Sequence, residues 1–339
     1  MKAALLAAGR GNRLRPATDH IPKPLLPIAC STLLEHNLLQ LSGFNEVYVV
    51  ISYKKELFSR YGEVYGVKLI DQGEPLGTGH ATLKLAELMG EEFLLVYSDV
   101  YLPPAFLDSL MREFDKYDHV AAVAPVDRPW EFGVVELEGR KLKRIVEKPR
   151  RGEEPSNLVI AGAFILSPSI FDILRELAPS PRGEVELTSA ITEAVSRGEE
   201  VGVVEVSPWV DAGRREDFLK AQEFLLRDMI TGCRKLPEGF KAEGSILIGR
   251  NAEIFESEIE GPCCLDAEIR GSLVGFNTYL QSGSEVISSV VRNSVVMGGS
   301  SIRDSEVISS IVSARSKVLN SKLVDSILPE GVEVKDLVT

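Results

Sequence analysis

The last third of this 339-residue chain carries a 16-residue repeat, which limits the folds that are possible. From residue 248 onward, aliphatic residues recur at steps of five or six and align in three columns, and serines align between them. The columns are Ile248, Cys264, Leu280, Val296, Val312 and Leu328; Ile254, Ile269, Val286, Ile302, Val318 and Val334; and Ile259, Val274, Val291, Val307 and Leu323. Three short strands per turn, each placing one aliphatic side chain inside, predict a parallel β-helix of about five coils.

An antiparallel sandwich of short strands is the alternative fold for these residues. Sandwich strands alternate apolar and polar residues at a period of two and do not hold a 16-residue register, which favours the β-helix. The spacing resembles the degenerate hexapeptide repeats of left-handed β-helices. We therefore expect a left-handed β-helix at residues 246–339, with Cys264 packed in its core as a small hydrophobe, and a linker at residues 232–245.

Up to about residue 230, short apolar runs alternate with amphipathic stretches. Strands are expected at residues 2–7, 46–52, 93–97 and 119–125, and helices at residues 33–41, 78–89, 105–116, 169–177 and 217–230. This alternation predicts βαβ units in an α/β domain at residues 1–231, with a Rossmann-like, mainly parallel sheet and helices on both faces. Ligands of such sheets bind beyond the carboxyl ends of the strands.

The charge and cysteine content exclude several classes of protein. The net charge is −12, whereas binding to nucleic acid requires an excess of Lys and Arg. No apolar run approaches the roughly 18–20 residues that cross a bilayer, so we expect no membrane partner. The four cysteines form no CxxC pattern. We therefore expect neither a disulfide framework nor a zinc site, and a location in the reducing cytoplasm.

The strongest chemical signal is the sequence AAGRGNRLRP at residues 7–16, directly after the first expected strand. A glycine-rich turn after a strand lets backbone N–H groups approach phosphate oxygens. Residues 1–28 contain five basic side chains and one acidic side chain, so the local field suits a polyphosphate. The alternative is a turn with a solvated basic face. The segment is not a Walker A loop, and the third glycine of a Rossmann fingerprint is missing.

Several motifs, in order along the chain, resemble those of sugar-1-phosphate nucleotidylyltransferases. The first is AGxGxRLxPxT at residues 8–18, in which Ala8 replaces the first glycine of the family's usual pair. The others are PKPLLPI at 22–28, QGEPLGTGHA at 72–81, SD at 98–99, FGVV at 132–135, EKP at 147–149, AG at 161–162 and WVDAG at 209–213. They cover most of residues 1–230 and look most like glucose-1-phosphate thymidylyltransferases. The LGTGHA run also resembles enzymes that use UTP and N-acetylglucosamine-1-phosphate.

The resemblance implies a reaction of a nucleoside triphosphate with a sugar-1-phosphate to give an NDP-sugar and pyrophosphate. The nucleophile is an anionic phosphate oxygen, so catalysis should consist of positioning and charge stabilisation. Arg13 and Lys23 would contact the nucleotide's phosphates, and Lys148 would present the sugar phosphate. Asp99 and Asp211 would bind Mg²⁺. A single aspartate after a strand is more often a helix cap or turn residue, and only the resemblance favours a metal role.

The resemblance also implies the residues that bind each substrate. The nucleotide would be held by Leu6, Ala8, Gly9, Gly11, Gln72, Gly77 and Thr78, and the sugar phosphate by Gly133, Glu147, Lys148 and Gly162. Gln72 suits the edge of a pyrimidine, but one methyl group separates thymine from uracil and is worth only about 1–3 kcal/mol. The expected nucleotide is therefore dTTP or UTP. His80 is expected to order its loop rather than to react.

Three functions remain open at this point. The first uses dTTP or UTP with glucose-1-phosphate, the second is a UTP-dependent N-acetylglucosamine-1-phosphate uridylyltransferase, and the third is a non-catalytic regulatory subunit that binds sugar nucleotides. Some relatives with such a tail also transfer acyl groups with a histidine base. The last histidine here is His119, so we expect no such acetyltransferase activity. We expect the β-helix to assemble a homo-oligomer.

Overall fold

The computed structural model describes residues 1–180 and 183–337. This part of the chain forms two compact units, each made from two stretches of sequence. The first unit comprises residues 1–9 and 40–209, and the second comprises residues 10–39 and the residues from 210 onward. The basic segment near the N-terminus therefore belongs to the same unit as the C-terminal repeat.

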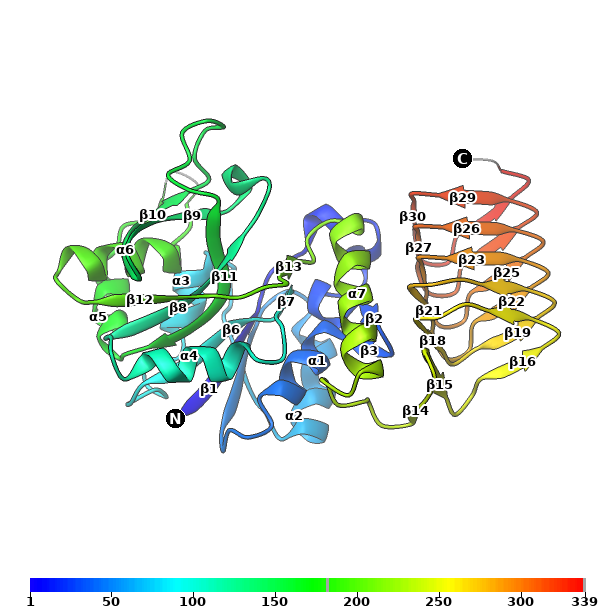
Figure 1. The fold of residues 1–339 in the computed structure, drawn as a ribbon, viewed down its shortest axis with the longest axis horizontal. Coiled ribbons are helices and arrows are strands. Elements are labelled where there is room, and N and C mark those ends of the chain that lie inside the picture. The colour runs from blue at the N-terminus through cyan, green and yellow to red at the C-terminus, as the bar shows by residue number, and fades with distance from the viewer. Residues whose placement is uncertain (181–182, 338–339) are drawn as a thin grey trace. The chain divides into compact units, whose positions relative to one another are not determined.

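The first unit is built on a mixed sheet with the strand order β5-β4-β1-β6-β11-β8-β12-β10-β9 (Figure 1). β1 pairs in parallel with β4 and β6, while β11 runs antiparallel to β6 and β8. The interior strands are nearly continuous apolar runs, as expected for strands buried on both faces. The strands are β1 (Lys2–Ala7), β4 (Val47–Ile51), β5 (Lys68–Asp71), β6 (Phe93–Tyr97), β8 (His119–Pro125), β9 (Gly133–Glu138), β10 (Lys141–Glu147), β11 (Leu158–Leu166) and β12 (Val201–Glu205).

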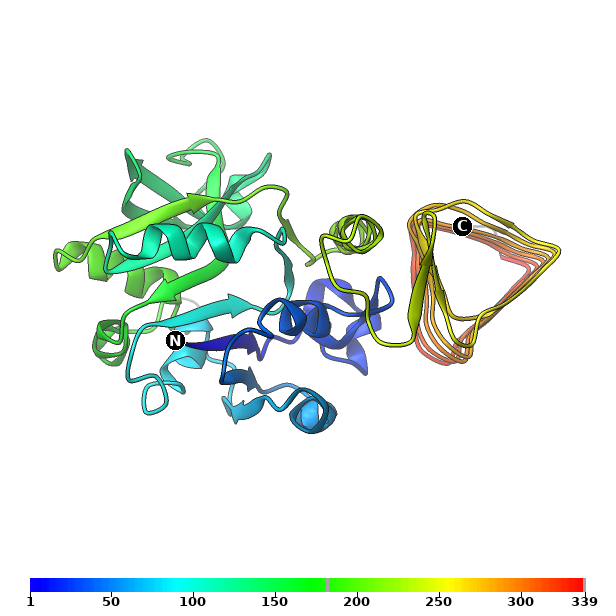
Figure 2. The same ribbon diagram turned by 60° about the horizontal axis from the view of Figure 1, so that its bottom comes forward.

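Helices cover both faces of this sheet (Figures 1 and 2). α3, α5 and α6 pack together on one face, where Phe93 stacks on Phe171 with ring centroids 5.3 Å apart. α4 packs on the opposite face against β8 and β12. The helices of this unit are α2 (Ser59–Tyr65), α3 (Thr78–Leu83), α4 (Phe106–Phe114), α5 (Ser169–Glu176) and α6 (Leu187–Ser196).

The predicted α/β class is confirmed, and the four predicted strands correspond to β1, β4, β6 and β8. The helix predicted over residues 78–89 ends early, at Leu83. Beyond it, the N–H groups of Lys84 and Leu85 bond to carbonyls three residues back, so the chain tightens into turns. Among the described residues, no helix is both long enough and apolar enough to span a bilayer.

The C-terminal part of the second unit is a stack of parallel strands with a triangular cross-section (Figure 2), which confirms the predicted β-helix. Face 1 consists of β14 (Phe240–Glu243), β15 (Ile246–Gly249), β18 (Cys263–Leu265), β21 (Thr278–Leu280), β24 (Val295–Val296), β27 (Ile311–Val312) and β30 (Ile327–Leu328). Face 2 consists of β16 (Glu253–Phe255), β19 (Glu268–Arg270), β22 (Glu285–Ile287), β25 (Ser301–Arg303), β28 (Lys317–Leu319) and β31 (Glu333–Lys335). Face 3 consists of β17 (Glu258–Ile259), β20 (Leu273–Val274), β23 (Val290–Arg292), β26 (Glu306–Ile308) and β29 (Lys322–Val324).

The strand register confirms the alignment of two of the three predicted columns, although Ile254 at the start of the second is exposed, and one position of the first column is wrong. The pairing aligns Ile248 with Leu265 and Leu265 with Leu280, so Leu265 fills the core position that the repeat assigned to Cys264. Because neighbouring residues of a strand point to opposite faces, this shift of one residue turns Cys264 out of the coil. The core residues Ile248, Leu265 and Leu280 are therefore 17 and then 15 residues apart, instead of 16 and 16.

Cys264 forms a disulfide with Cys30, 234 residues earlier in the chain. The prediction that Cys264 packs in the core as a free thiol is therefore wrong, and one disulfide is present where no disulfide framework was expected. Cysteine spacing carries no signal for a pair that only the fold of the second unit brings together. Among the described residues, Cys233 and Cys263 are free thiols.

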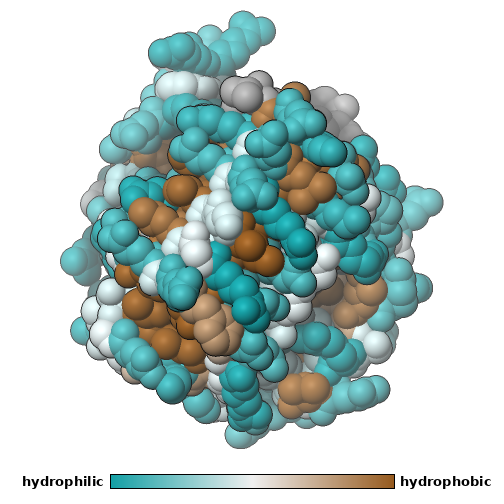
Figure 3. Space-filling view, turned by 90° about the vertical axis from the view of Figure 1, so that its right-hand side faces the viewer, coloured by the Kyte–Doolittle hydropathy of each residue, from teal (hydrophilic) through white to brown (hydrophobic). Residues whose placement is uncertain are grey.

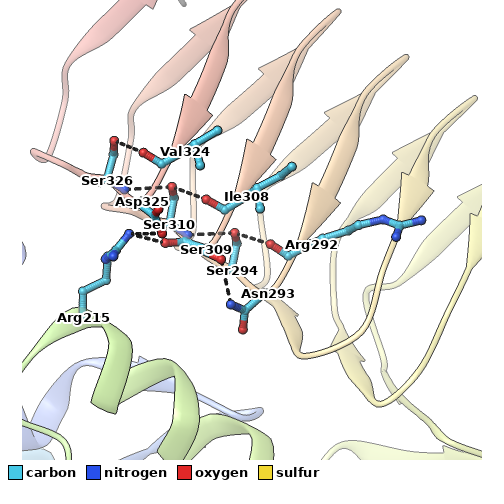
Figure 4. A network of polar contacts seen from close by, with 10 residues as sticks. All are labelled: Arg215, Arg292, Asn293, Ser294, Ile308, Ser309, Ser310, Val324, Asp325 and Ser326. Atoms are coloured by element: carbon cyan, nitrogen blue, oxygen red, sulfur yellow. Dashed lines mark hydrogen bonds and ion pairs between the residues drawn. The ribbon is translucent and has the colours of Figure 1, made fainter. Parts of the chain in front are cut away.

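The aligned serines form hydrogen-bonded ladders at the corners of the coils (Figure 4). The Ser310 hydroxyl donates to the Ile308 carbonyl at 2.7 Å and accepts the Ser326 N–H at 3.1 Å. Ser294 occupies the same place one coil earlier and accepts the Ser310 N–H at 3.0 Å. Each serine hydroxyl thereby accepts the N–H of the serine one coil later, while the Ile308 carbonyl also accepts the Asp325 N–H at 3.1 Å. The repeated serines thus bond successive corners to one another, which explains their 16-residue spacing.

Helix α7 (Arg215–Ile230) is bonded to the β-helix within the second unit. Arg215 donates to the Ser309 carbonyl and to the Asp325 carboxylate, both at 2.8 Å (Figure 4). Deeper in the interface, the amide of Gln222 donates to the Asn277 carbonyl at 2.7 Å.

The predicted linker contains β14, which pairs antiparallel with β15 and begins face 1. The rest of this unit holds η1 (Asn12–Leu14), η3 (Lys23–Leu25), β2 (Pro27–Ile28), β3 (Ser31–Thr32), α1 (Leu33–Gln40) and β13 (Val210–Asp211).

Candidate active site

Three of the predicted site residues meet in the second unit, around the carboxylate of Asp211. Arg13 Nη2 donates to Asp211 Oδ2 at 2.9 Å, and Lys23 Nζ donates to Asp211 Oδ1 at 3.0 Å. The side chain of Lys23 is only 6% exposed, whereas that of Arg13 is 52% exposed. The arrangement gives one fixed, buried ammonium and one accessible guanidinium on the same carboxylate.

The charge state of Asp211 follows from these neighbours. Burial by itself would raise the pKa of this carboxyl, because it penalises the ionised form. The opposing charges of Lys23 and then Arg13 outweigh burial and hold the pKa of Asp211 below its ordinary value. Asp211 is therefore a carboxylate at neutral pH, which is the form that a divalent cation requires.

Two glycines shape this cluster, which we call the Asp211 cluster. Gly11 lies in the left-handed region at φ 68°, and a Cβ there would lie 2.8 Å from Cβ of Lys23. The Gly11 carbonyl also accepts the Thr18 hydroxyl at 2.9 Å, which closes the basic turn. A Cβ at Gly213 would lie 2.5 Å from Arg13 Nη2. The glycines therefore leave the space in which Arg13 and Lys23 converge, and sequence reasoning did not identify the role of Gly213.

We predict that Gly213→Ala breaks the Arg13–Asp211 pair and leaves the fold intact. The new methyl group meets the ends of two side chains, Arg13 Nη2 at 2.5 Å and Asp211 Oδ2 at 2.9 Å, so these groups move and the backbone does not. Loss of one charge-assisted hydrogen bond should lower kcat/KM, for the reaction that the sequence motifs imply, about tenfold. Steady-state kinetics and a thermal melt measure this. Gly43→Ala is the control, since a Cβ there meets no atom within 4 Å; equal kinetics for both variants would contradict the prediction.

The first unit holds the segment predicted to read the nucleobase. Gln72 is buried at the end of β5, and its amide donates to the Gly77 carbonyl at 3.1 Å and lies 3.0 Å from His80 Nδ1. The Thr78 hydroxyl donates to Glu186 Oε2 at 3.2 Å and accepts the Leu187 N–H at 3.0 Å. The contact with Gln72 agrees with an ordering role for His80. This loop is therefore fixed against the start of α6.

Position 77 also requires a glycine. Its φ is 103°, and a Cβ would lie 2.5 Å from the Val185 carbonyl oxygen. By contrast, a Cβ at Gly9 would meet no atom within 4 Å. Packing therefore does not explain the glycine at position 9, which leaves its backbone open to close approach by a ligand.

Asp99 follows the carboxyl end of β6, where ligands of such sheets bind. The preceding Ser98 is buried, and its hydroxyl donates to the Leu6 carbonyl at 2.6 Å. The Ser98 N–H bonds to the same carbonyl. Ser98 thereby fixes the start of the Asp99 loop against β1.

The residues predicted to hold the sugar phosphate lie together in the first unit. Glu147 ends β10 beside Gly133, where a Cβ would lie 3.0 Å from Glu147 Oε2. The Thr188 hydroxyl donates to that same oxygen at 3.2 Å, a contact that sequence reasoning missed. Lys148 has a φ of 46° and donates its N–H to the Phe132 carbonyl at 2.9 Å, so its half-exposed side chain leaves the strand at a fixed turn.

Gly162 and Trp209 fix the backbone of β11 and of the Phe132 turn, next to the residues predicted to hold the sugar phosphate. Gly162 has a φ of 80°, and a Cβ there would lie 2.7 Å from the ring of Tyr97. Trp209 Nε1 donates to the Ala161 carbonyl at 2.8 Å, and its ring meets Phe132 edge-on at 5.5 Å. Burial raises the pKa of Tyr97, so its hydroxyl stays neutral. Tyr97 has no counterpart among the sequence motifs.

Comparison with known proteins now identifies the family. Residues 2–228 match the family described as Nucleotidyl transferase. The chain belongs to the nucleotidyl transferase family. Among curated relatives of this nucleotidyl transferase, "Bifunctional protein GlmU" of Methanococcus maripaludis is 36% identical over 75% of this chain. The match spans 62% of that relative, which is less than two thirds of its length.

Two other comparisons extend the similarity. "Glucose-1-phosphate thymidylyltransferase" of Streptomyces griseus is 31% identical over 87% of each chain, so this match includes part of the β-helix region. A crystal structure described as UDP-glucose pyrophosphorylase complexed with UDP-glucose has a TM-score of 0.60 and 26% identity. It covers 65% of this nucleotidyl transferase and 96% of the solved chain.

Proposed function

We propose that this nucleotidyl transferase joins a nucleoside triphosphate to a sugar-1-phosphate and releases pyrophosphate. The Asp211 cluster carries the proposal, because it fixes a buried ammonium and an accessible guanidinium beside one carboxylate. Both substrates are anions, so their mutual repulsion is the main obstacle to reaction. Preorganised cations reduce this obstacle, and no general base is needed because the attacking phosphate oxygen is already ionised.

The remaining residues would divide the two substrates between them. Lys23 and Arg13 would bind the nucleotide's phosphates and stabilise charge on the departing pyrophosphate. Lys148 would hold the sugar phosphate, while Glu147 would accept hydrogen bonds from sugar hydroxyls. The buried Gln72 would meet a pyrimidine edge through its amide oxygen, because its NH2 group donates to the Gly77 carbonyl and lies 3.0 Å from His80 Nδ1.

Asp99 and Asp211 would hold Mg²⁺, which would neutralise phosphate charge when bound. Among residues 1–180 and 183–337, no three His, Cys, Asp or Glu side chains group closely enough to hold a metal by themselves. Mg²⁺ takes one or two protein carboxylates and completes its shell with waters and substrate phosphates, so this donor set is sufficient. The ionised Asp211 fits the role.

Glucose-1-phosphate with dTTP or UTP is the proposed substrate pair, supported by the thymidylyltransferase relative and by the QGEPLG segment at residues 72–77. A UTP-dependent N-acetylglucosamine-1-phosphate uridylyltransferase is the second candidate, favoured by the LGTGHA run at residues 76–81. A regulatory subunit without catalysis is disfavoured, because mere binding would not require Arg13, Lys23 and an ionised Asp211 together.

One panel of reactions tests these candidates. Four nucleoside triphosphates plus dTTP are each combined with glucose-, N-acetylglucosamine-, mannose- and galactose-1-phosphate, and pyrophosphate release is measured. We expect turnover with dTTP or UTP that EDTA abolishes and Mg²⁺ restores. Absence of turnover with every pair would refute the enzyme and favour the regulatory subunit. Thiol release from acetyl-CoA with an amino-sugar phosphate would contradict the expected lack of acetyltransferase activity.

We also propose that the β-helix supports a homo-oligomer. Figure 3 shows hydrophobic side chains interspersed with hydrophilic ones on one side of it. On face 2, the exposed Phe255 is covered in part by Arg270, whose guanidinium lies 4.6 Å from the ring centre. Subunit contacts are on the whole about as apolar as other protein surfaces, so a mixed face of this kind is suitable for one. Light scattering checks the proposal, and a monomer at all tested concentrations would exclude it.

A further inference from the structure

The hairpin of β2 and β3 places Cys30 at its tip, in an unfavourable backbone conformation. Pro27 pairs with Thr32 and Ile28 with Ser31, so Ala29 and Cys30 form a two-residue turn. Their φ angles are 44° and 69°, both in the left-handed region. Two-residue turns of this form usually contain Asn-Gly, because residues with a Cβ are disfavoured there. Contacts outside the turn must therefore hold it.

Three contacts hold the hairpin tip, which is buried. His36 Nε2 lies 3.1 Å from the Ala29 carbonyl oxygen, and Gln222 of α7 accepts the Ala29 N–H at 3.4 Å. The third contact is the disulfide from Cys30 to Cys264. The disulfide is a direct covalent link from the hairpin to the β-helix.

Cys264 lies on the outward side of face 1, in a row of residues that is buried although it points out of the coil. The strand pairing aligns Leu247, Cys264, Tyr279, Val295 and Ile311 in this row. All five are less than 5% exposed. The disulfide therefore attaches the hairpin to a rigid, packed surface rather than to a mobile loop.

A short path leads from the hairpin to the Asp211 cluster. The Leu26 N–H bonds to the Lys23 carbonyl at 3.1 Å, and β2 begins at the next residue. Lys23 itself lies against Gly11 and bonds to Asp211. The turn at residues 23–26 therefore joins Lys23 directly to the base of the hairpin.

We propose that Cys30 and Cys264 are positioning residues for Lys23, so that their redox state sets how tightly the enzyme binds the nucleotide's phosphates. The inference rests on the proposed function. A dithiol reductant would supply two electrons, the S–S bond would break, each sulfur would gain a proton, and the reductant would become a disulfide. An added disulfide oxidant reverses the exchange. The sugar-phosphate residues belong to the first unit, whereas Cys30 and Cys264 belong to the second.

The test compares oxidised and reduced full-length protein. Reduction should raise KM for the nucleoside triphosphate about tenfold, as expected for weakening one charge-assisted contact, and should leave KM for the sugar-1-phosphate within about twofold. Reoxidation should restore both values. A general loss of structure would change both KM values, so the split distinguishes positioning from a merely structural role. Equal shifts in both, or no shift in a protein shown to be reduced, would overturn the proposal.

Variants complete the design. Cys30→Ser and Cys264→Ser should match the reduced wild type and ignore reductant, which also covers a disulfide that resists reduction. Cys233→Ser, at an exposed free thiol, should respond to reductant as the wild type does. A response that persists in Cys30→Ser would overturn the proposal.

Two measurements do not depend on turnover and separate this proposal from the proposed function. Thiol counting by mass spectrometry should find two free cysteines in oxidised protein and four after reduction. Hydrogen exchange over residues 23–32 should become faster on reduction while the β-helix core stays protected. Four free thiols in untreated protein, or unchanged exchange after reduction, would overturn the tether even if the enzyme is active.

Discussion

Replacing Lys23 with methionine is expected to reduce kcat/KM for the proposed reaction by about 10²–10³, the cost of removing one preorganised group that stabilises transition-state charge. Methionine keeps most of the length of the side chain beside Gly11 but loses the ammonium. Asp211 keeps Arg13 as an ion-pair partner at 2.9 Å, so the carboxylate is not left without compensation. The fold should therefore survive, with a stability loss of about 1–3 kcal/mol.

Kinetics and a denaturant titration measure both effects. Lys116→Met is the matched control, because the exposed Lys116 pairs with Glu113 just beyond the end of α4, and such pairs contribute about 0–1 kcal/mol. It should leave kcat/KM within about twofold of the wild type. If Lys23→Met kept more than a tenth of the wild-type kcat/KM, Lys23 would not contact the reacting phosphates.

The repeat made the β-helix predictable because each coil uses the same solution for its core. Val286, Ile302 and Val318 align as the 16-residue spacing requires. The error at Cys264 has a specific cause, since Cys264 and Leu265 are adjacent and both apolar. Periodicity alone cannot choose between two such residues, while the strand register can, and the choice reverses which side chain points inward.

The candidate site was predictable as a set of motifs but not as a set of contacts. The sequence indicated that Arg13, Lys23 and Asp211 belong to one site, and the structure brings these three together. It did not indicate that Lys23 is buried on Asp211 or that Gly213 makes room for Arg13. Both features depend on contacts between segments that are about 190 residues apart in the sequence, and local sequence patterns carry no information about such contacts. The glycine of the WVDAG motif was nevertheless a usable signal.

The sequence pattern and the compact units divide the chain at different places. The repeat marks residues 246–339 as distinct, whereas residues 10–39 and α7 cluster with the β-helix. The buried outward row of face 1, the bonds from Arg215 and Gln222, and the disulfide all attach to these segments. The predicted boundary at residues 231–246 therefore separates sequence patterns, and we propose that it does not separate folding units.

Two isoleucines three residues apart test this proposal. Ile311 points outward on face 1 and is fully buried, while Ile308 points outward on face 3 and is partly exposed. Ile311→Asp should lower the free energy of unfolding by about 4 kcal/mol or more, because it buries a charge without a partner. Ile308→Asp should cost less than about 1 kcal/mol, since water still solvates the new carboxylate.

Denaturant unfolding of both variants, followed by circular dichroism and by pyrophosphate release, makes the comparison. If the β-helix were an independent tail, Ile311 would lie on its surface and both variants would unfold at nearly the same denaturant concentration. We expect Ile311→Asp alone to lose activity together with stability, because its row is the surface to which Cys264 ties the hairpin and, through it, Lys23.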